Sequence, residues 1–301
     1  MRCFAAPPEP RGLPIANPNL FAISDLHVNC PANHGVVEKL RPETQGDWLL
    51  VAGDVADHVE DVAATLRLLR DRFAKVIWTP GNHELWTLPN DAAQLRGDRR
   101  YRYLVEICRG LGILTPEDAY PVWQSEDETL VVAPLFLLYD YSLRPEGLSK
   151  QEALAQARAA NVVCADELLL ASDPWSSREI WCEQRLAYTR RRLDEIPGAL
   201  RTVLVSHWPL HPGPTRRLRF PEFALWCGTR ATLDWHRLYR AAACIYGHLH
   251  IPKTETYDGA RFEEVSLGYP AEWQARGLPS AGPLRRIMPE AVALRTATAR
   301  R

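Results

Sequence analysis

The stretch YGHLHIP, residues 246–252, places His248 and His250 one residue apart, directly after the apolar run AAACI. If the chain stays extended, both side chains point to one face about 6 to 7 Å apart, because a strand rises ~3.3 Å per residue and its side chains alternate. Two imidazoles at this spacing could each bind one of two adjacent metal ions. An isolated pair of this kind also fits ordinary surface or core histidines. The rest of the sequence is therefore needed to distinguish a metal-binding pair from such histidines.

Short apolar runs that are typical of strands alternate with amphipathic segments along the chain. Strands are predicted at residues 20–24, 48–53, 75–81, 129–136, 201–207, 242–247 and 261–268. Helices are predicted at residues 59–73, 99–112, 149–170 and 177–196. Strands separated by helices indicate a layered α/β fold.

Polar side chains follow five of these strands. In an open α/β sheet the ligand crevice lies beyond the carboxyl ends of the strands, so residues far apart in sequence can meet there. The candidate metal ligands are Asp25, His27, Asp54, Asn82, His207, His248 and His250. Seven N and O donors exceed the three protein ligands of a typical catalytic zinc. They suit two metal ions that share one carboxylate, with His248 and His250 on different ions.

Each candidate also has an ordinary structural interpretation. Asn82 follows Pro80-Gly81 and Asp54 follows Gly53, which are positions typical of turns, and His207 could lie in the core. Glu84 is interpreted as a helix-starting or supporting carboxylate rather than a ligand. The agreement of five blocks within one chain favours a dinuclear site over these separate explanations.

The ordered series DxH, GD, GNHE, an isolated His before Pro209 and GHxH resembles the calcineurin-like metallophosphoesterases. The resemblance implies an α/β fold, a four-layer α/β/β/α sandwich of two mixed β-sheets flanked by helices. It also implies a role for each motif residue: the first metal on Asp25, His27 and His250, the second on Asn82, His207 and His248, a bridging Asp54, and His83 facing the phosphoryl oxygens.

Two divalent metal ions would polarise a phosphoryl group and activate a water molecule as the nucleophile. His83 can stabilise the developing charge or protonate the leaving oxygen, so His83 and Asp54 are the predicted catalytic residues. Asn82 and His83 are also predicted to contact the substrate. Imidazole and carboxylate donors accept Mn, Fe or Zn. We expect Mn, with Fe and Zn as the alternatives.

The sequence also bears on the substrate. Phosphoprotein phosphatases extend the second block to GDxxDRG, whereas residues 53–59 read GDVADHV, which disfavours a phosphoprotein substrate. Longer stretches, FAKVIWTPGNHELWT, LFLLYDYS, FPEFALWCGT and YGHLHIPKTETYDGARFEEVSLGYP, resemble the actinobacterial 4'-phosphopantetheinyl hydrolases. This resemblance runs from about residue 21 to residue 273. It implies cleavage of the phosphodiester of a holo acyl carrier protein.

Aromatic and basic residues near the motifs fit such a substrate. Trp86 and Trp208 lie beside metal blocks, and the basic run of residues 216–219 precedes three further aromatics, Phe220, Phe223 and Trp226. We expect Trp86 and Trp208 to contact the pantetheine arm and Arg217 to meet an acidic carrier-protein helix. The alternative is that the tryptophans pack in the core and the arginines form a solvated loop.

Three other functions are alternatives to this interpretation. A phosphomonoesterase acting on a small phosphorylated metabolite or biosynthetic intermediate would use the same residues. The size of the space beside the metals would distinguish it from a phosphodiesterase, and we expect residues 135–144 and 211–229 to shape that space. A nucleotide phosphodiesterase or nuclease is disfavoured by the net charge of -1, so no nucleic-acid partner is expected. A metal-free scaffold is disfavoured because clustered polar residues are costly to bury.

The 301 residues, of which 46% are hydrophobic, suffice for one large domain. We expect a single domain over residues 1–301, with a core at about 20–275, a helical insertion at about 143–197 and tails at 1–19 and 279–301. No signal peptide is evident, and the longest apolar run, residues 130–139, is too short to cross a bilayer. A cytoplasmic location without membrane contact is therefore expected, while the oligomeric state stays open.

Overall fold

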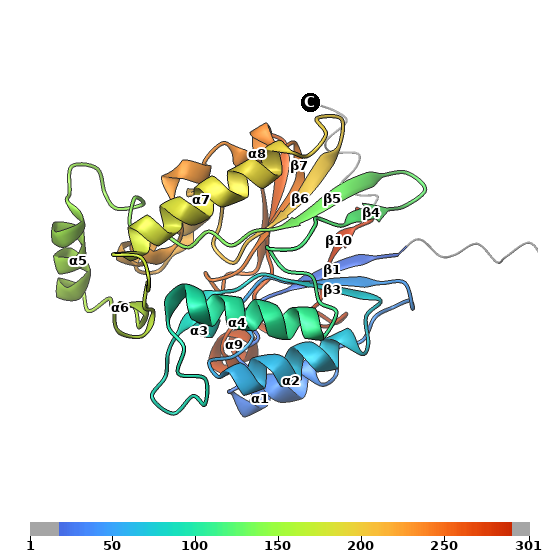
Figure 1. Cartoon of the computed structure of the whole chain (residues 1–301), viewed down its shortest axis with the longest axis horizontal. Coiled ribbons are helices and arrows are strands. Elements are labelled where there is room, and N and C mark those ends of the chain that lie inside the picture. The colour runs from blue at the N-terminus through green and yellow to red at the C-terminus, as the bar shows by residue number, and fades with distance from the viewer. Residues whose placement is uncertain (1–17, 291–301) are drawn as a thin grey trace, which may run out of the picture.

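Two β-sheets lie face to face, and helices cover their outer sides (Figure 1). The computed structural model describes residues 18–290. The first sheet has the order β10-β1-β2-β3, and the second has the order β4-β5-β6-β7-β9-β8. This arrangement confirms the predicted four-layer α/β/β/α sandwich.

The first sheet is mixed. Its parallel strands are β1 (Leu20–Ile23), β2 (Trp48–Val51) and β3 (Lys75–Trp78). They are short and almost entirely apolar, as expected for parallel strands that are covered on both faces. The fourth strand, β10 (Arg285–Met288), pairs with β1 in the antiparallel direction.

The second sheet is also mixed. Its four parallel strands are β5 (Thr129–Pro134), β6 (Arg201–Val205), β7 (Ala241–Tyr246) and β9 (Ala260–Glu264). Two antiparallel strands form its edges, β4 (Val122–Gln124) and β8 (Lys253–Tyr257). Each of the seven predicted strands is therefore present, whereas β4, β8 and β10 were not predicted.

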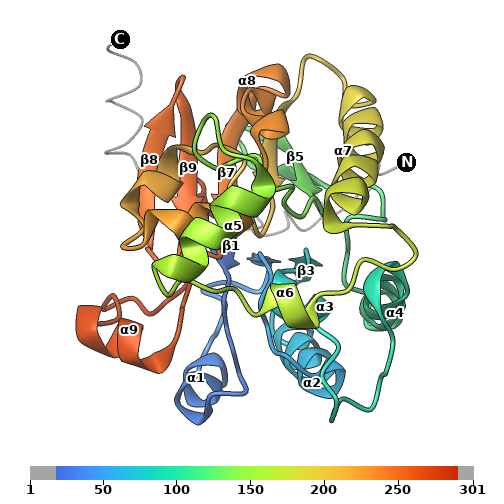
Figure 2. The ribbon, with the colours of Figure 1, turned by 90° about the vertical axis from the view of Figure 1, so that its left-hand side faces the viewer.

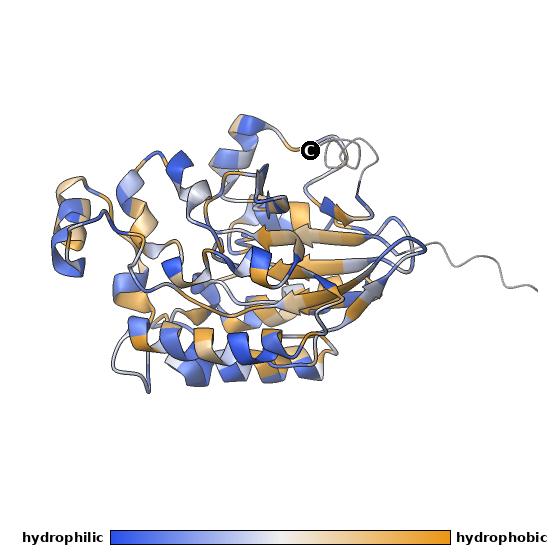
Figure 3. Cartoon of the chain, turned by 90° about the horizontal axis from the view of Figure 1, so that it is seen from above, coloured by the Kyte–Doolittle hydropathy of each residue, from blue (hydrophilic) through white to orange (hydrophobic). Residues whose placement is uncertain are grey.

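Alternate residues of each strand face different cores. Leu20 and Ala22 of β1 pack between the sheets with Val203 of β6, while Phe21 and Ile23 face the helix side. A third cluster on the outer face of the second sheet contains residues such as Leu204 and Cys244. Figure 3 shows largely hydrophobic strands beside helices that alternate hydrophilic and hydrophobic residues.

Helices on the first sheet include α1 (Pro31–Val37), α2 (Val59–Arg70) and α4 (Gly97–Gly110). The second sheet is covered by α7 (Arg178–Asp194) and by the single turn α8 (Trp235–Leu238). The remaining short elements are α3 (Asn82–Leu85), η1 (Gly213–Arg217), η2 (Pro221–Trp226), η3 (Arg230–Thr232) and α9 (Pro270–Arg276). Among residues 18–290, no helix is long and apolar enough to cross a membrane.

The predicted helix at residues 149–170 is two helices, α5 (Lys150–Ala159) and α6 (Asp166–Leu169). Asn161 has a φ of 58°, and a left-handed residue just after the last helical turn ends a helix, a position where Asn is tolerated. Both helices lie beyond the carboxyl ends of the strands, in front of the sheets in Figure 2. The insertion therefore covers one end of the sandwich.

Part of the predicted C-terminal tail belongs to the core of the fold. Residues 279–301 were placed outside the core, yet Arg285–Met288 forms β10 with Ile287 and Met288 buried. Two apolar residues after two arginines give too short a pattern to predict a strand. Residues 1–17 and 291–301 lie outside the described residues.

Candidate metal centre

The loops that follow five parallel strands meet at one end of the sandwich. Asp25 and His27 follow β1, Asp54 follows β2, Asn82 and His83 begin α3 after β3, His207 follows β6, and the His248/His250 pair follows β7. Their side chains form three overlapping groups of potential metal ligands: Asp25, His27 and His250; His27, Asp54 and His83; Asp54, His207 and His248. These groups contain six of the seven residues that the sequence proposed as ligands. The seventh, Asn82, contacts His207 and His248.

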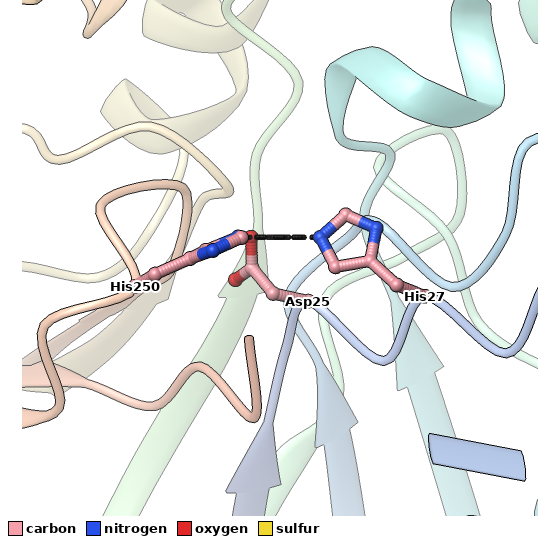
Figure 4. A group of neighbouring side chains, drawn as sticks. All are labelled: Asp25, His27 and His250. Carbon is pink, nitrogen blue, oxygen red and sulfur yellow. Dashed lines mark hydrogen bonds and ion pairs between the residues drawn. The ribbon is translucent and has the colours of Figure 1, made fainter. Parts of the chain in front are cut away.

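The first group surrounds one carboxylate oxygen (Figure 4). His250 Nε2 lies 3.0 Å from Asp25 Oδ1, and His27 Nε2 lies 3.9 Å from the same oxygen. The two imidazole Nε2 atoms are 3.2 Å apart. The other oxygen, Asp25 Oδ2, accepts a hydrogen bond from Ser266 Oγ, and the His248 backbone N–H is shared between Oδ2 at 3.0 Å and Oδ1 at 3.2 Å.

We use the name second group for Asn82, His207 and His248, whose donor atoms also lie close together. His207 Nε2 lies 3.1 Å from Asn82 Oδ1 and 3.1 Å from His248 Nδ1, and those two atoms are also 3.1 Å apart. His207 Nδ1 donates to the Ala52 carbonyl at 2.9 Å. This hydrogen bond holds a hydrogen on Nδ1, so that in the neutral imidazole the lone pair is on Nε2 and faces the group.

Asp54 lies between the two groups. Its Oδ2 atom is 4.0 Å from His27 Nε2 and 3.4 Å from His207 Nε2, whereas Oδ1 accepts the His83 backbone N–H at 3.0 Å. One oxygen therefore faces both groups, which is the position required of a shared carboxylate.

The backbone of the site is unusual. The φ angles of Asp25, His27, Asp54, His248 and His250 are 52°, 40°, 55°, 69° and 56°. The expectation that His248 and His250 sit on extended backbone was therefore wrong, and a turn rather than a pleat directs them to different groups. Left-handed residues of this kind each cost about 1 to 3 kcal/mol and gather at functional sites.

The donor set fits cations. His207 Nε2, His248 Nδ1 and Asn82 Oδ1 are mutually 3.1 Å apart, and at most one hydrogen can lie among three such acceptors. Burial opposes protonation of His207, but the Asp54 carboxylate raises the pKa of His207 to about 9. Burial and the nearby His207 lower the pKa of His248 to about 3, so His248 is neutral and can bind a metal. The buried Asp54 carboxylate therefore favours a positive charge beside His207, His248 and Asn82. A divalent metal ion bound to these nitrogen and oxygen donors would supply that charge.

Two carboxylates, the buried Glu84 and the exposed Glu272, hold the loops in place. Glu84 accepts hydrogen bonds from the backbone N–H groups of Asp54, Val55 and Gly81 at 2.9, 3.0 and 2.9 Å, which agrees with its interpretation as a supporting residue. Glu272 accepts from His250 Nδ1 at 2.8 Å and was not predicted. A Glu at the third position of a Pro-initiated helix was its only sequence signal.

His83 faces the centre from α3. Its Nε2 lies 3.7 Å from Asp54 Oδ2, and its Nδ1 donates to Asp57 Oδ1 at 2.7 Å. Burial opposes protonation, but the carboxylates of Asp54 and Asp57 outweigh it and raise the pKa of His83. This role of Asp57 was not predicted, although Asp57 lies in the GDVAD block of residues 53–57.

A cleft of about 330 Å³ opens over the centre. Its base includes Asp54, Asn82, His83, His248 and His250, and its walls include Trp86, Val163, Leu218, Phe223 and Tyr269. Residues 211–229 contribute as expected, but residues 135–144 do not line this cleft, because residues 163–165 of the insertion take that place.

Two residues predicted to contact the substrate, Trp208 and Arg217, do not line this cleft. Trp208 is buried in the core, where its ring contacts His207 at 5.1 Å and His248 at 6.0 Å between centroids, so it supports the ligands from behind. Arg217 forms an ion pair with Glu255 at 2.6 Å. Trp86 does line the cleft, with its ring centroid 3.7 Å from that of His83.

Comparisons with known proteins agree with this geometry. Residues 18–252 match the model of the calcineurin-like phosphoesterase family. The [acyl-carrier-protein] phosphodiesterase PptH of Mycobacterium tuberculosis is 51% identical over 276 residues, which cover 91% of this chain and 85% of that protein. The crystal structure of phosphopantetheinyl hydrolase (PptH) from Mycobacterium tuberculosis matches with a TM-score of 0.89, covering 91% of this chain and 97% of that one.

Proposed function

This chain belongs to the calcineurin-like phosphoesterase family, and on that premise we propose that it hydrolyses the phosphodiester of a holo acyl carrier protein, releasing 4'-phosphopantetheine and the carrier serine. It is a metal-dependent phosphoester hydrolase of that family. The observation that carries the choice of substrate is the 51% identity to an acyl-carrier-protein phosphodiesterase across 91% of the chain.

The ligand assignment follows the geometry of the two groups. Asp25, His27 and His250 would hold one ion, the other would lie on Asn82, His207 and His248, and Asp54 Oδ2 would be shared. When bound, two divalent ions polarise the phosphoryl oxygens and activate a water molecule. The donors are imidazole, carboxylate and amide groups without a thiolate. We propose Mn as the metal, and Fe and Zn are compatible with the same donors.

In the proposed reaction His83 supplies a proton to the leaving group. Its Nδ1–H is held by Asp57, so Nε2 is directed toward the centre. A protonated Nε2 can donate to the leaving serine oxygen as the bond to phosphorus breaks. Asp57 thereby orients the imidazole and stabilises its charged form.

The walls of the cleft suit the amphipathic phosphopantetheine arm of a holo carrier protein. Val163, Leu218 and Phe223 offer apolar surface, while Trp86 and Tyr269 add aromatic rings. Arg216 and Arg219, on either side of Leu218, are exposed, whereas Arg217 is paired. We therefore assign contact with an acidic carrier surface to Arg216 and Arg219 in place of Arg217.

Two substrates test the proposal. The Mn-loaded enzyme is given a purified holo carrier protein and, separately, an aryl phosphate monoester, and kcat/KM is measured for both. We expect a higher kcat/KM for the carrier protein and loss of both activities in His248→Ala. Turnover of the monoester without release of phosphopantetheine would instead support the small-molecule phosphomonoesterase.

A further inference from the structure

Asp166, at the start of α6 in the helical insertion, contacts one residue of the metal centre, Asn82, and one residue of the cleft wall, Trp86. Its side chain is fully buried. Asp166 Oδ1 accepts a hydrogen bond from Asn82 Nδ2 at 2.9 Å and another from Trp86 Nε1 at 2.7 Å. We propose that Asp166 is a positioning residue that sets the orientation of the Asn82 amide and thereby completes the second ion site. This inference rests on the proposed function.

The amide of Asn82 has two ends of nearly equal shape, but only the oxygen can bind a cation. Asn82 Oδ1 lies 3.1 Å from both His207 Nε2 and His248 Nδ1. A rotation of the amide by half a turn would place its NH₂ group there and its oxygen beside Asp166. Because Asp166 offers an acceptor and Asn82 is 4% exposed, that rotation would bury two facing acceptors and lose the hydrogen bond from Asn82 to Asp166.

The same carboxylate oxygen also fixes the wall of the cleft. The Trp86 indole that donates to Asp166 Oδ1 packs against His83, with 3.7 Å between ring centroids. One acceptor therefore positions a metal ligand and the aromatic ring beside the proposed proton donor. Residues 163–165, directly before Asp166, line the same cleft.

Helix α6 is anchored well enough to act as a support. Arg178 donates to the backbone carbonyls of Asp166 and Leu170. Glu167 forms an ion pair with Arg178 at 3.0 Å and accepts from Trp226 Nε1 at 2.8 Å. The insertion is thus joined to the centre through Asp166 on one side and to α7 and η2 on the other.

Three variants test the inference, with Mn binding to the chelated protein as the readout. Asp166→Ala removes the acceptor, whereas Asp166→Asn keeps an oxygen that can accept both hydrogen bonds. Glu167→Gln is the matched control, because it changes the neighbouring carboxylate on the same helix without contact to Asn82. Titration calorimetry gives the affinity of each ion, and thermal unfolding of the metal-free proteins reports the fold.

We expect Asp166→Ala to weaken one of the two ions by about 10- to 100-fold and to leave the other close to wild type. Asp166→Asn and Glu167→Gln should keep both ions within a few-fold of wild type. Unchanged binding in Asp166→Ala would overturn the inference. Equal weakening of both ions in Asp166→Ala and Glu167→Gln would overturn it too, since that indicates only a loosened fold. A wild-type protein that binds fewer than two ions would overturn the two-ion centre itself.

Discussion

His83 and Asp57 form a hydrogen-bonded pair, with 2.7 Å between His83 Nδ1 and Asp57 Oδ1, and the pair links the loop after β2 to the first residues of α3. The contact directs the other ring nitrogen of His83 toward Asp54 Oδ2 at 3.7 Å. The imidazole is therefore oriented by a residue that belongs to neither group of proposed ligands.

We predict that Asp57→Asn lowers kcat by about 10- to 100-fold with little change in KM, because the charged form of His83 loses a stabilising carboxylate. The metal content should stay at the wild-type value. Steady-state kinetics and elemental analysis check both statements, with the exposed Asp61→Asn on α2 as control. Loss of metal in Asp57→Asn would contradict the separation of roles.

Removal of metal should abolish hydrolysis and lower the thermal stability. Two ions that bind only the folded protein each stabilise it by about 2.7 kcal/mol at a hundred times Kd, which corresponds to a rise in Tm of several degrees for a domain of this size. Calorimetric scans of chelated protein with and without added Mn measure the shift. Full activity after exhaustive chelation would refute the account of the centre.

The exposed arginines beside the cleft should matter for a protein substrate only. Arg216→Glu and Arg219→Glu should lower kcat/KM on a holo carrier protein by roughly tenfold, because like charges slow the encounter with an acidic partner. Hydrolysis of an aryl phosphate should not change. Arg190→Glu, an exposed residue on α7, is the matched control. Equal losses on both substrates would remove Arg216 and Arg219 from carrier recognition.

The contact between α7 and the core predicts a pH dependence of stability. Burial disfavours the Glu117 carboxylate, but Arg185 at 2.7 Å outweighs burial and lowers the pKa of Glu117. A lowered folded-state pKa contributes stability above the unfolded value of about 4.3, and this contribution is lost as the pH falls through the folded pKa.

Glu117→Gln should therefore destabilise the protein by about 2 kcal/mol at pH 7, with a smaller difference from wild type below about pH 4. Thermal unfolding at both pH values measures this, with the exposed Glu106→Gln as control. A difference in Tm that stays constant with pH would argue against the ion pair as its source.

The sequence allowed the ligand positions to be predicted because they are tied to the ends of apolar strands. Asp54 follows β2 of the first sheet and His207 follows β6 of the second sheet. The parallel strands within each sheet end on the same side, and the two sets of strand ends meet at one end of the sandwich. The predicted extended geometry of His248 and His250 failed because the strand ends at Tyr246, and both residues then adopt left-handed conformations.

The supporting residues could not be predicted in the same way. Asp166 reaches Asn82 across 84 positions of sequence, and Glu272 reaches His250 from a helix that shows no apolar periodicity. Such partners depend on how the insertion and α9 fold back over the strand ends. Trp208 was predicted to contact the substrate because it follows His207 in the sequence. His207 faces the metal centre, but the Trp208 ring is buried behind His207 in the core.

The central claim is that this two-ion centre cleaves a carrier-protein phosphodiester at phosphorus. The most direct test is intact mass spectrometry of a holo acyl carrier protein after incubation with the Mn-loaded enzyme in oxygen-18 water, with Asp54→Asn in parallel. We predict that wild type alone converts the carrier to its unlabelled apo mass and that the released 4'-phosphopantetheine carries the heavy oxygen. An unchanged carrier mass, or heavy oxygen in the carrier, would contradict the claim.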